Sequence, residues 1–279
     1  MRELEVATID QFESASQRAG TRIVVVRPLH GAVLIKGSDI EVTMRDGVEI
    51  DRLRIDHGQK RIRLQGGRYG EIFLSHPAQF HPVKAPRPEW IIEDVIIEGV
   101  EIRSPGSAIE AYGHRIAVLD SDIHAQRYSF WSGPVLGIGS QDIFIARNRM
   151  SSAGPESTLR LVDVVRSVTV DNVLRNNIKH NYRVHGRSDL AYAARNVFIN
   201  TGVMFGTMPG DDIGEMWFED NTFFHRQNDL FHPGQVARLH AAGNKAHTAN
   251  FRCFCCEQTR ASWRLDKNEL LPYREPPPF

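Results

Sequence analysis

The chain has 279 residues, of which 41% are hydrophobic and 24% are charged, so it can bury a core and is not disordered by composition. Its 34 basic and 34 acidic residues give a formal net charge of zero, which excludes the overall positive field typical of proteins that bind nucleic acid or anionic membranes. The longest aliphatic run, residues 23–26, is far shorter than the roughly 18 apolar residues of a membrane-spanning helix. We therefore expect neither a nucleic-acid partner nor a membrane partner.

The N-terminal segment predicts a short helix at residues 9–19. Thr8 and Gln11 have the spacing of a capping box. An apolar stripe follows at helical spacing and consists of Ile9, Phe12, Ala15 and Ala19. The first five residues contain no apolar signal core, so we expect a cytoplasmic protein unless a leader was removed, in which case it is secreted or periplasmic.

Residues 21–98 read as strands with a loose register, interrupted by a proline-rich stretch at residues 77–89. This stretch carries four prolines, which cannot donate to a strand ladder. We expect a long loop that projects from one coil. Long loops on an otherwise regular fold are often functional.

From residue 148 onward a short β pattern ends repeatedly in asparagine. The intervals are 24, 24, 25, 23 and 24 residues, and the positions are Asn148, Asn172, Asn196, Asn221, Asn244 and Asn268. Extended backward, the register reaches Asp122 and Gly99, residue types that tolerate a left-handed backbone as Asn does. A fixed period of this length is the sequence signature of a solenoid.

The repeat predicts an all-β fold, a right-handed parallel β-helix of about ten coils that forms a single domain over residues 1–279. Leucine-rich repeats have a similar length, but their L-x-x-L-x-L spacing is missing here. Apolar residues in period-2 alternation favour three short strands per coil, with the helix at residues 9–19 capping one end. The asparagine side chains are expected to stack in one line and to hydrogen-bond from coil to coil.

The C-terminal region carries the only cysteines and a proline-rich tail. Cys253, Cys255 and Cys256 lie within four residues, a spacing that fits neither a disulfide framework nor a zinc site, so we expect reduced, unliganded thiols. Residues 271–279 include four prolines and cannot continue a strand. This tail is expected to fold across the last coil.

The helix cap, the 24-residue coils and the recurring asparagine together resemble the pectate-lyase-like superfamily of right-handed β-helices. The resemblance covers nearly the whole chain. Members of that superfamily include polysaccharide lyases, polygalacturonase-type hydrolases, uronan epimerases and phage tailspikes, so it implies the fold but not one reaction. In such proteins the substrate groove usually runs along the strand that precedes the asparagine-ended strand.

Alternation along that preceding strand separates inward from outward residues. The residues predicted to point inward are Ile109, Leu159, Leu161, Tyr182, Val184 and Phe251. Those predicted to point outward are Glu110, Tyr112, Arg160, Arg183, His185 and Arg252. Arg160 and Arg183 fall on neighbouring coils, and like charges stacked roughly 5 Å apart are unfavourable unless an anion lies between them. The alternative is that each pairs with a carboxylate such as Asp163 or Glu110.

The segment Tyr182–Arg187 is similar to the arginine-containing strand of alginate- and chondroitin-type lyases, in which an Arg-x-x-Gly or Arg-His-Gly run borders the groove. The resemblance implies a lysine base on the preceding coil and acidic calcium ligands nearby. Here that coil offers Arg160 and no lysine, and no cluster of outward carboxylates is apparent. We therefore predict no cofactor and no metal site, with calcium left open but without identifiable ligands.

β-Elimination on a uronic acid needs a cation for the carboxylate and a base for the adjacent C5 proton. We predict that Arg183 and His185 are catalytic: Arg183, together with Arg160, binds the carboxylate of an acidic polysaccharide, and His185 transfers the proton. Tyr112 is the reserve acid or base. The predicted flanking substrate contacts are Arg252, Glu110 and Trp131.

Three alternatives to a lyase stay open. An epimerase would use the same proton abstraction. A hydrolase needs two carboxylates, and Asp211 and Asp212, with Asp229 a coil later, are the candidate set, although Pro-Gly-Asp-Asp is also an ordinary turn sequence. A non-catalytic carbohydrate-binding or structural β-helix would use exposed aromatic residues as stacking platforms, unless these fill the mouth of the core: Trp90, Tyr128, Phe130 and Trp131.

Overall fold

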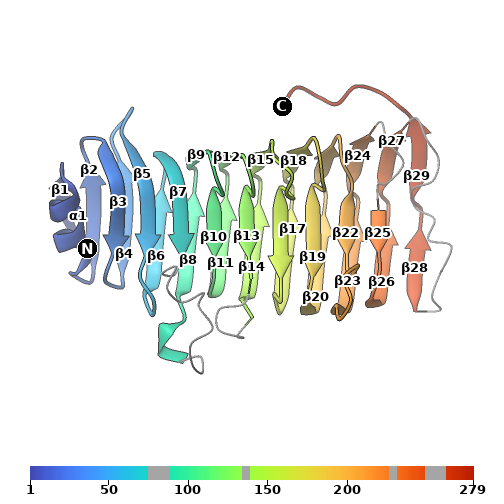
Figure 1. The fold of residues 1–279 in the computed structure, drawn as a ribbon, viewed down its shortest axis with the longest axis horizontal. Helices are drawn as coiled ribbons and strands as arrows, with labels where there is room; N and C mark the ends of the chain where they lie inside the picture. Colours follow the sequence, from blue (N-terminus) through green and yellow to red (C-terminus); the bar gives the residue numbers. More distant parts are fainter. Residues whose placement is uncertain (75–87, 134–138, 226–230, 249–261) are drawn as a thin grey trace.

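The computed structural model describes residues 1–74, 88–133, 139–225, 231–248 and 262–279. These residues form a rod of stacked coils, a parallel β-solenoid of about nine turns (Figure 1). The predicted fold class is confirmed. In the part of the chain that the structure describes, no helix has the length and apolarity needed to cross a lipid bilayer.

The strands stack in three columns of parallel strands. The first column contains β1 (Arg2–Val6), β2 (Thr21–Val25), β4 (Ile40–Met44), β6 (Lys60–Gln65), β8 (Glu93–Glu98), β11 (His114–Leu119), β14 (Gln141–Ala146), β17 (Arg166–Val170), β20 (Arg187–Ala194), β23 (Asp212–Glu219), β26 (Val236–Ala242) and β28 (Trp263–Asp266). The second contains β9 (Glu101–Ser104), β12 (Asp122–Ala125), β15 (Arg149–Ser152), β18 (Val173–Asn176), β21 (Val197–Ile199), β24 (Thr222–His225), β27 (Lys245–Thr248) and β29 (Glu269–Pro272). The third contains β10 (Ile109–Ala111), β13 (Phe130–Ser132), β16 (Leu159–Val162), β19 (Tyr182–His185), β22 (Val203–Phe205) and β25 (Phe231–Pro233).

The first coils depart from the predicted three strands per coil. There, one long strand takes the place of a second-column and a third-column strand, in β3 (Leu29–Ile35), β5 (Glu49–Ile55) and β7 (Arg68–Leu74). β7 marks the transition, because Tyr69 pairs with Ile102 of β9 while Ile72 pairs with Ile109 of β10. From β9 onward the coils have the predicted three strands, and β25 is the last third-column strand among the described residues.

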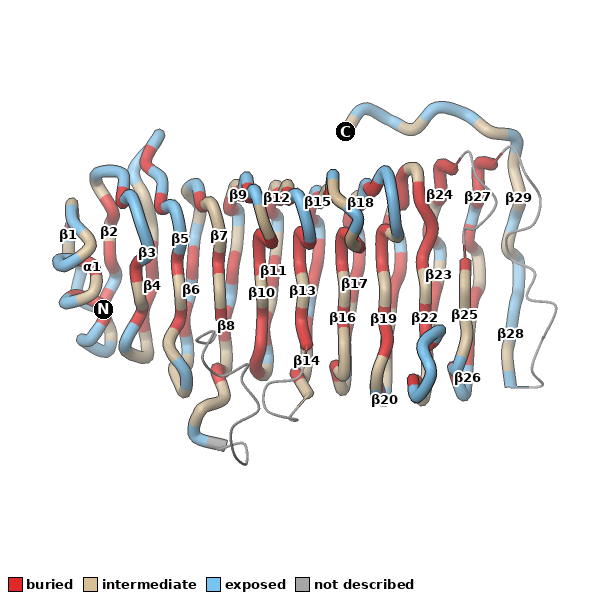
Figure 2. Tube along the Cα trace, viewed as in Figure 1, coloured by how far each residue is buried: buried red, intermediate tan, exposed pale blue. Residues whose placement is uncertain are grey.

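Alternate residues of every column fill one continuous core, which follows the axis of the rod (Figure 2). The residues predicted to point inward on the third column are no more than 1% exposed: Ile109, Leu159, Leu161, Tyr182 and Val184. The prediction for these positions is confirmed. Phe251 lies outside the described residues.

Helix α1 (Ile9–Ser16) covers one end of the rod (Figure 1) and buries Phe12 and Ala15. The capping pattern holds, since the Thr8 side chain accepts a hydrogen bond from the Gln11 backbone N–H at 3.3 Å. The predicted end at residue 19 is wrong, because the helix stops at Ser16 and Ala19 is exposed. The backbone N–H of Arg18 instead donates to the Ala15 carbonyl at 3.1 Å, and this tight turn brings the chain into β2.

The six asparagines occupy one position of the coil, just before the second column. Each of the first five donates its Nδ2–H to Oδ1 of the asparagine in the next coil at 2.8–3.0 Å. The same Oδ1 atoms also accept the backbone N–H of the preceding asparagine at 2.9–3.1 Å. The side-chain amides are therefore satisfied inside the protein, where an unpaired amide is costly.

The backward extension of this register is wrong by one residue. Ser121 holds the asparagine position in the preceding coil, since its backbone N–H donates to Asn148 Oδ1 at 3.0 Å. The left-handed residue of each turn comes one place earlier, at Gly99, Asp120, Arg147, Asp171, Arg195, Asp220, Gly243 and Lys267. The asparagines thus recur for their hydrogen bonds and not for a left-handed backbone.

The expected path of the tail is also wrong. After β29, residues 273–279 run back along the second column and do not cross the last coil (Figure 1). The Arg274 guanidinium lies 5.3 Å from the ring centroid of Phe224, and the Phe279 ring lies 5.3 Å from the guanidinium of Arg149. An extended proline-rich segment needs no partner strand, so side-chain contacts are enough to hold it.

Two predictions fall largely or wholly outside the described residues. Of the predicted loop at residues 77–89, only the 3-10 turn η2 (Pro88–Trp90) overlaps the described part of the chain. The three cysteines, Cys253, Cys255 and Cys256, lie outside it.

Candidate functional site

The outward residues of the third column form a single row along the rod, called here the outer row. Its members are Cα partners in successive strands: Glu110, Trp131, Arg160, Arg183, Met204 and His232. Arg160 and Arg183 therefore stand directly opposite each other on β16 and β19, as predicted. Arg252, predicted to flank them, lies outside the described residues.

Arg160 is held by three polar neighbours. Its Nε–H donates to His185 Nε2 at 2.8 Å, and its Nη1–H donates to Tyr128 Oη at 2.7 Å. A carboxylate oxygen of Glu156 lies 3.8 Å from Nη1. Sequence reasoning missed Glu156, although a spacing of four residues from Arg160 could have drawn attention to it. The carboxylate of Asp163, offered as a partner, instead accepts the backbone N–H of Arg187 at 2.8 Å.

Arg183 has no such support. Its Nε is buried and has no hydrogen-bond partner among the described residues, where it also forms no ion pair. Burial lowers the pKa of the guanidinium, and the neighbouring charge of Arg160 lowers it further. A half-buried cation beside a second cation is a position that an anion stabilises.

His185 lies on the same face as Arg183 but is only 8% exposed, so it is less accessible than an outward position predicts. Because an arginine can only donate, His185 Nε2 must accept, which places the proton of the neutral ring on Nδ1. Burial, followed by the charges of Arg160 and Arg183, lowers the pKa of His185 to about 4. The imidazole is therefore neutral near pH 7.

The lowered pKa of His185 predicts a specific acid sensitivity. The unfolded chain takes up a proton at the usual pKa of 6.5, whereas the folded protein resists it until about pH 4, so stability falls as the pH drops through this window. His185→Gln is expected to lose less stability between these pH values than the unmodified protein. Urea unfolding at a series of pH values measures the difference, with the exposed His30→Gln as the matched control. Identical pH profiles for His185→Gln and the unmodified protein would contradict the lowered pKa.

The position directly after His185 requires glycine, which is Gly186. Its φ is +78°, and a Cβ at this position would come within 2.3 Å of Asp163 Oδ1. Gly186→Ala is expected to lower the free energy of unfolding by about 2 kcal/mol or more, from the left-handed backbone and the clash together. Gly210→Ala is the control, because its φ is +87° but the space around it is open. Equal losses for the two variants, measured by urea unfolding, would exclude the contribution of the clash.

The outward placement predicted for Tyr112 is wrong. The side chain is 2% exposed, and its ring packs edge-on against Trp131, with centroids 5.6 Å apart. Burial, and then the charge of Glu110, raises the pKa of the Tyr112 hydroxyl well above its usual range. Glu110 is half-buried as well, and burial raises the pKa of its carboxyl. Tyr112 thus supports the row from beneath and is poorly placed to exchange a proton with a ligand.

The four aromatic residues offered as stacking platforms differ in exposure and in position. Phe130 is fully buried in the core, whereas Trp131 is partly exposed and stacks on Tyr128 with ring centroids 5.6 Å apart. Trp90, beside His57, lies away from the outer row. Trp131 alone of the four is therefore a member of the outer row.

The candidate carboxylates for hydrolysis serve a different purpose. Asp211 is buried, and its two oxygens accept the backbone N–H groups of Gly186 and Met208, both at 2.7 Å. Asp212 is exposed at the start of β23, and Asp229 lies outside the described residues. The arrangement is that of a turn fixed by a carboxylate, which was the alternative interpretation of this sequence.

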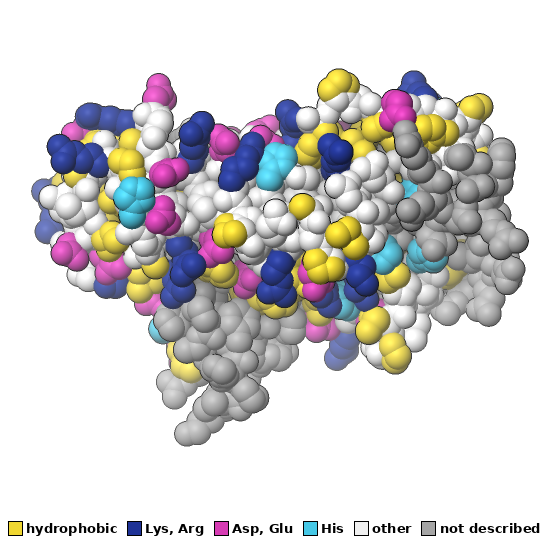
Figure 3. Space-filling view, turned by 45° about the horizontal axis from the view of Figure 1, so that its top comes forward, with side chains coloured by type: hydrophobic (Ala, Val, Ile, Leu, Met, Phe, Trp, Pro, Cys, Tyr) yellow, Lys and Arg dark blue, Asp and Glu magenta, His cyan; other side chains and the backbone are white. Residues whose placement is uncertain are grey.

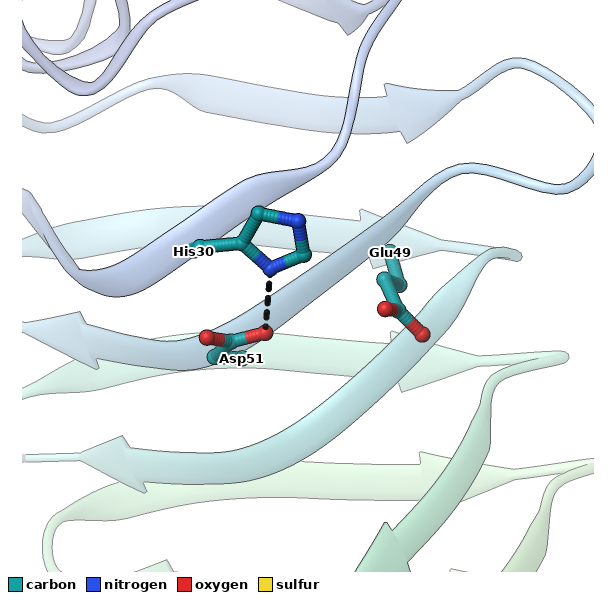
Figure 4. A group of neighbouring side chains, drawn as sticks. All are labelled: His30, Glu49 and Asp51. Carbon is teal, nitrogen blue, oxygen red and sulfur yellow. Dashed lines mark hydrogen bonds and ion pairs between the residues drawn. The ribbon is translucent and has the colours of Figure 1, made fainter.

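Among the described residues, one group has the spacing of metal ligands, and it lies elsewhere. His30, Glu49 and Asp51 place one ligand atom each within 4.8 Å of one another on β3 and β5, and all three are exposed (Figure 4). The Asp51 carboxylate is already engaged by His30 at 3.3 Å and by the Gly31 backbone N–H at 2.9 Å. This group is several coils away from Arg160 and Arg183 and takes no part in the outer row.

Charges of both signs are interspersed on the face drawn in Figure 3, in keeping with the zero net charge. Many are paired between coils, as in the two-pronged contacts of Arg147 with Asp120 and of Arg195 with Asp171. Arg183 is distinguished by its position opposite Arg160 on the neighbouring strand, together with a buried Nε that has no partner among the described residues.

Comparison with known proteins establishes the fold alone. No protein-family model matches the chain, and no curated protein matches it in sequence. Among solved structures, an alginate lyase from Paenibacillus sp. strain FPU-7 is similar with a TM-score of 0.52 and 12% identity, over 96% of this chain and 99% of that one. The Dettilon tailspike protein is similar with a TM-score of 0.51 and 12% identity, over 93% of this chain and 63% of that one.

Proposed function

We propose that the protein cleaves an acidic polysaccharide by β-elimination, with the polymer lying along the outer row. The observation that carries this proposal is the pair Arg160 and Arg183, directly opposed on adjacent strands, with no carboxylate among the described residues bound to Arg183. A uronate carboxylate supplies the missing anion, and guanidinium groups bind carboxylates in a two-pronged geometry. The similarity in fold to an alginate lyase supports the same class of substrate.

His185 is the proposed base, and the substrate prepares it. In the free protein Arg160 occupies its Nε2, and burial, followed by the charges of Arg160 and Arg183, lowers its pKa. When Arg160 turns to the substrate carboxylate, Nε2 becomes available, and the added negative charge offsets the two guanidinium charges and raises the pKa of His185. His185 then removes the C5 proton, the electron pair forms the C4–C5 double bond, and the glycosidic oxygen leaves C4.

The leaving oxygen needs a proton, and Tyr128 is better placed to supply it than Tyr112. Both side chains are buried, but the Tyr128 hydroxyl accepts a hydrogen bond from Arg160 and so lies beside the proposed carboxylate site. Burial, and then Glu156, raises the pKa of the Tyr128 hydroxyl, which keeps it protonated as an acid must be.

Incubation with alginate, polygalacturonate and chondroitin sulfate tests the reaction, with ultraviolet absorbance of the unsaturated uronate end as the readout. Such absorbance with at least one polymer is the expected result. Chain cleavage with saturated ends would indicate a hydrolase, and inversion at C5 without cleavage, detected by NMR, would indicate an epimerase. Binding without any of these products would overturn the enzymatic proposal and favour a carbohydrate-binding β-helix.

A further inference from the structure

A second group of reactive side chains lies on the second column, away from the outer row. His124 of β12 and Ser151 of β15 are Cα partners on adjacent coils, and Asp122 lies two residues before His124 on the same face. His124 Nδ1 is in hydrogen-bond contact with Ser151 Oγ, and its Nε2 lies 2.8 Å from Asp122 Oδ1. A hydroxyl, an imidazole and a carboxylate are thus connected in series, the arrangement that activates a serine nucleophile.

The protons in this series have only one consistent placement. Although burial opposes it, the hydrogen bond from Arg103 and the contact with His124 hold the pKa of the Asp122 carboxyl below its usual range, so it can only accept. Burial lowers the pKa of His124, which makes the neutral ring the dominant form near pH 7. Nε2 must then carry the ring proton and donate a hydrogen bond to Asp122, and Nδ1 must accept a hydrogen bond from the Ser151 hydroxyl. Arg103 fixes the other carboxylate oxygen of Asp122 at 2.8 Å.

The surroundings provide space and positive charge. Beside this series the returning tail forms a half-open cavity of about 310 Å³, which is bounded by Arg175, Ile199 and Asn200 on one side and by residues 273 and 275–279 on the other. The three reactive side chains adjoin the cavity through Phe279 and Arg175 and do not themselves line it. Arg175 stands opposite Ser151 in the next coil. The Phe279 ring lies 5.8 Å from the guanidinium of Arg175 and packs edge-on against His124. A cavity of this size suits a small ligand.

From these contacts we propose that Ser151, His124 and Asp122 form a second active site, which hydrolyses small carboxylic esters carried by anionic molecules. Ser151 Oγ attacks the acyl carbon while its proton passes to His124 Nδ1, and the same proton then goes to the alcohol as the ester C–O bond breaks. Water then attacks the acyl carbon while it gives one proton to His124 Nδ1, and this proton returns to Ser151 Oγ as the acyl–Oγ bond breaks and the carboxylic acid leaves. Arg175 is the cation closest in register to the developing oxyanion. This site uses none of the residues of the outer row, so it stands independently of the proposed lyase activity.

Two measurements on the full chain test the site. The first is labelling with a fluorophosphonate probe, followed by peptide mass spectrometry, and the adduct is expected on Ser151. The second is hydrolysis of p-nitrophenyl acetate, which is expected to fall at least ~100-fold in Ser151→Ala and in His124→Ala. Ser14→Ala, at an exposed serine of helix α1, is the matched control and should keep the full rate. Circular dichroism checks that each variant is folded.

Arg175→Ala tests the charge preference, because it should slow hydrolysis of 4-acetoxybenzoate, an anionic ester, more than hydrolysis of p-nitrophenyl acetate. Absence of a Ser151 adduct on the unmodified protein would overturn the proposal whatever the variants show. The proposal would also be overturned if the Ser151 adduct formed as fast in Asp122→Asn and His124→Ala as in the unmodified protein, because Ser151 would then react without its proposed partners.

Discussion

Replacing Arg183 with alanine is expected to lower turnover on a polyuronate substrate by a factor of about 100 to 1,000, the usual effect of removing one group that stabilises developing charge. The fold should persist, because the side chain points outward and the core residues around it are unchanged. Stability is expected to stay constant or to rise slightly, since the substitution removes a repulsion with Arg160 and an unsatisfied buried Nε.

Two further variants sharpen this prediction. Arg183→Lys keeps the charge but not the planar fork, so it should recover only part of the lost rate. Arg238→Ala on β26 removes the same charge from an exposed ion pair with Glu215 of β23 and should leave turnover unchanged. Initial rates of unsaturated product formation and thermal unfolding curves measure both effects. Full activity in Arg183→Ala would place the reaction elsewhere on the rod.

Asn196→Ala is expected to be among the most destabilising single changes in the chain, at about 3–5 kcal/mol. Its Nδ2 donates to the Thr169 carbonyl at 2.8 Å and to Asn221 Oδ1 at 3.0 Å, and its Oδ1 accepts two N–H groups of Asn172. Alanine removes all four hydrogen bonds and leaves their partners buried and unsatisfied.

Asn177→Ala is the matched control for this change. Asn177 is exposed and accepts a single hydrogen bond from Asn200 at 2.7 Å, so its loss should cost less than about 1 kcal/mol. Urea unfolding of the two variants gives the comparison. A loss at Asn196 no larger than that at Asn177 would show that the amide chain contributes little to the stability of the solenoid.

The sequence predicted the solenoid because its period is a local property that repeats. An interval of 23 to 25 residues brings each asparagine beside the next, and a buried amide that bonds both neighbours has few substitutes. Alternation on the third column likewise placed Leu161 and Val184 inside and Arg160 and Arg183 outside. These results need only the strand geometry and the coil length, and both can be read from the chain itself.

The period could not locate features that depend on a single residue or on contacts across coils. The backward extension of the asparagine register named Asp122 instead of Ser121. Ser121 holds that position but is a different residue type whose side chain can also form hydrogen bonds. Tyr112 was assigned to the surface by alternation, yet Trp131 from the next coil packs against it. The tautomer of His185 follows from its hydrogen bond with Arg160, which is 25 residues away in sequence, and its lowered pKa follows from burial and then from the charges of Arg160 and Arg183.

What the sequence by itself determined is therefore the fold class, the column that carries the arginine pair and the line of asparagines, because each repeats with the coil. The tertiary structure alone decided which side chains from different coils meet: Tyr128 with Arg160, Ser151 with His124, and the tail with the second column. The physical reason is that stacking places residues more than twenty positions apart within hydrogen-bonding distance. Contacts of this kind between coils do not produce a periodic pattern in the sequence.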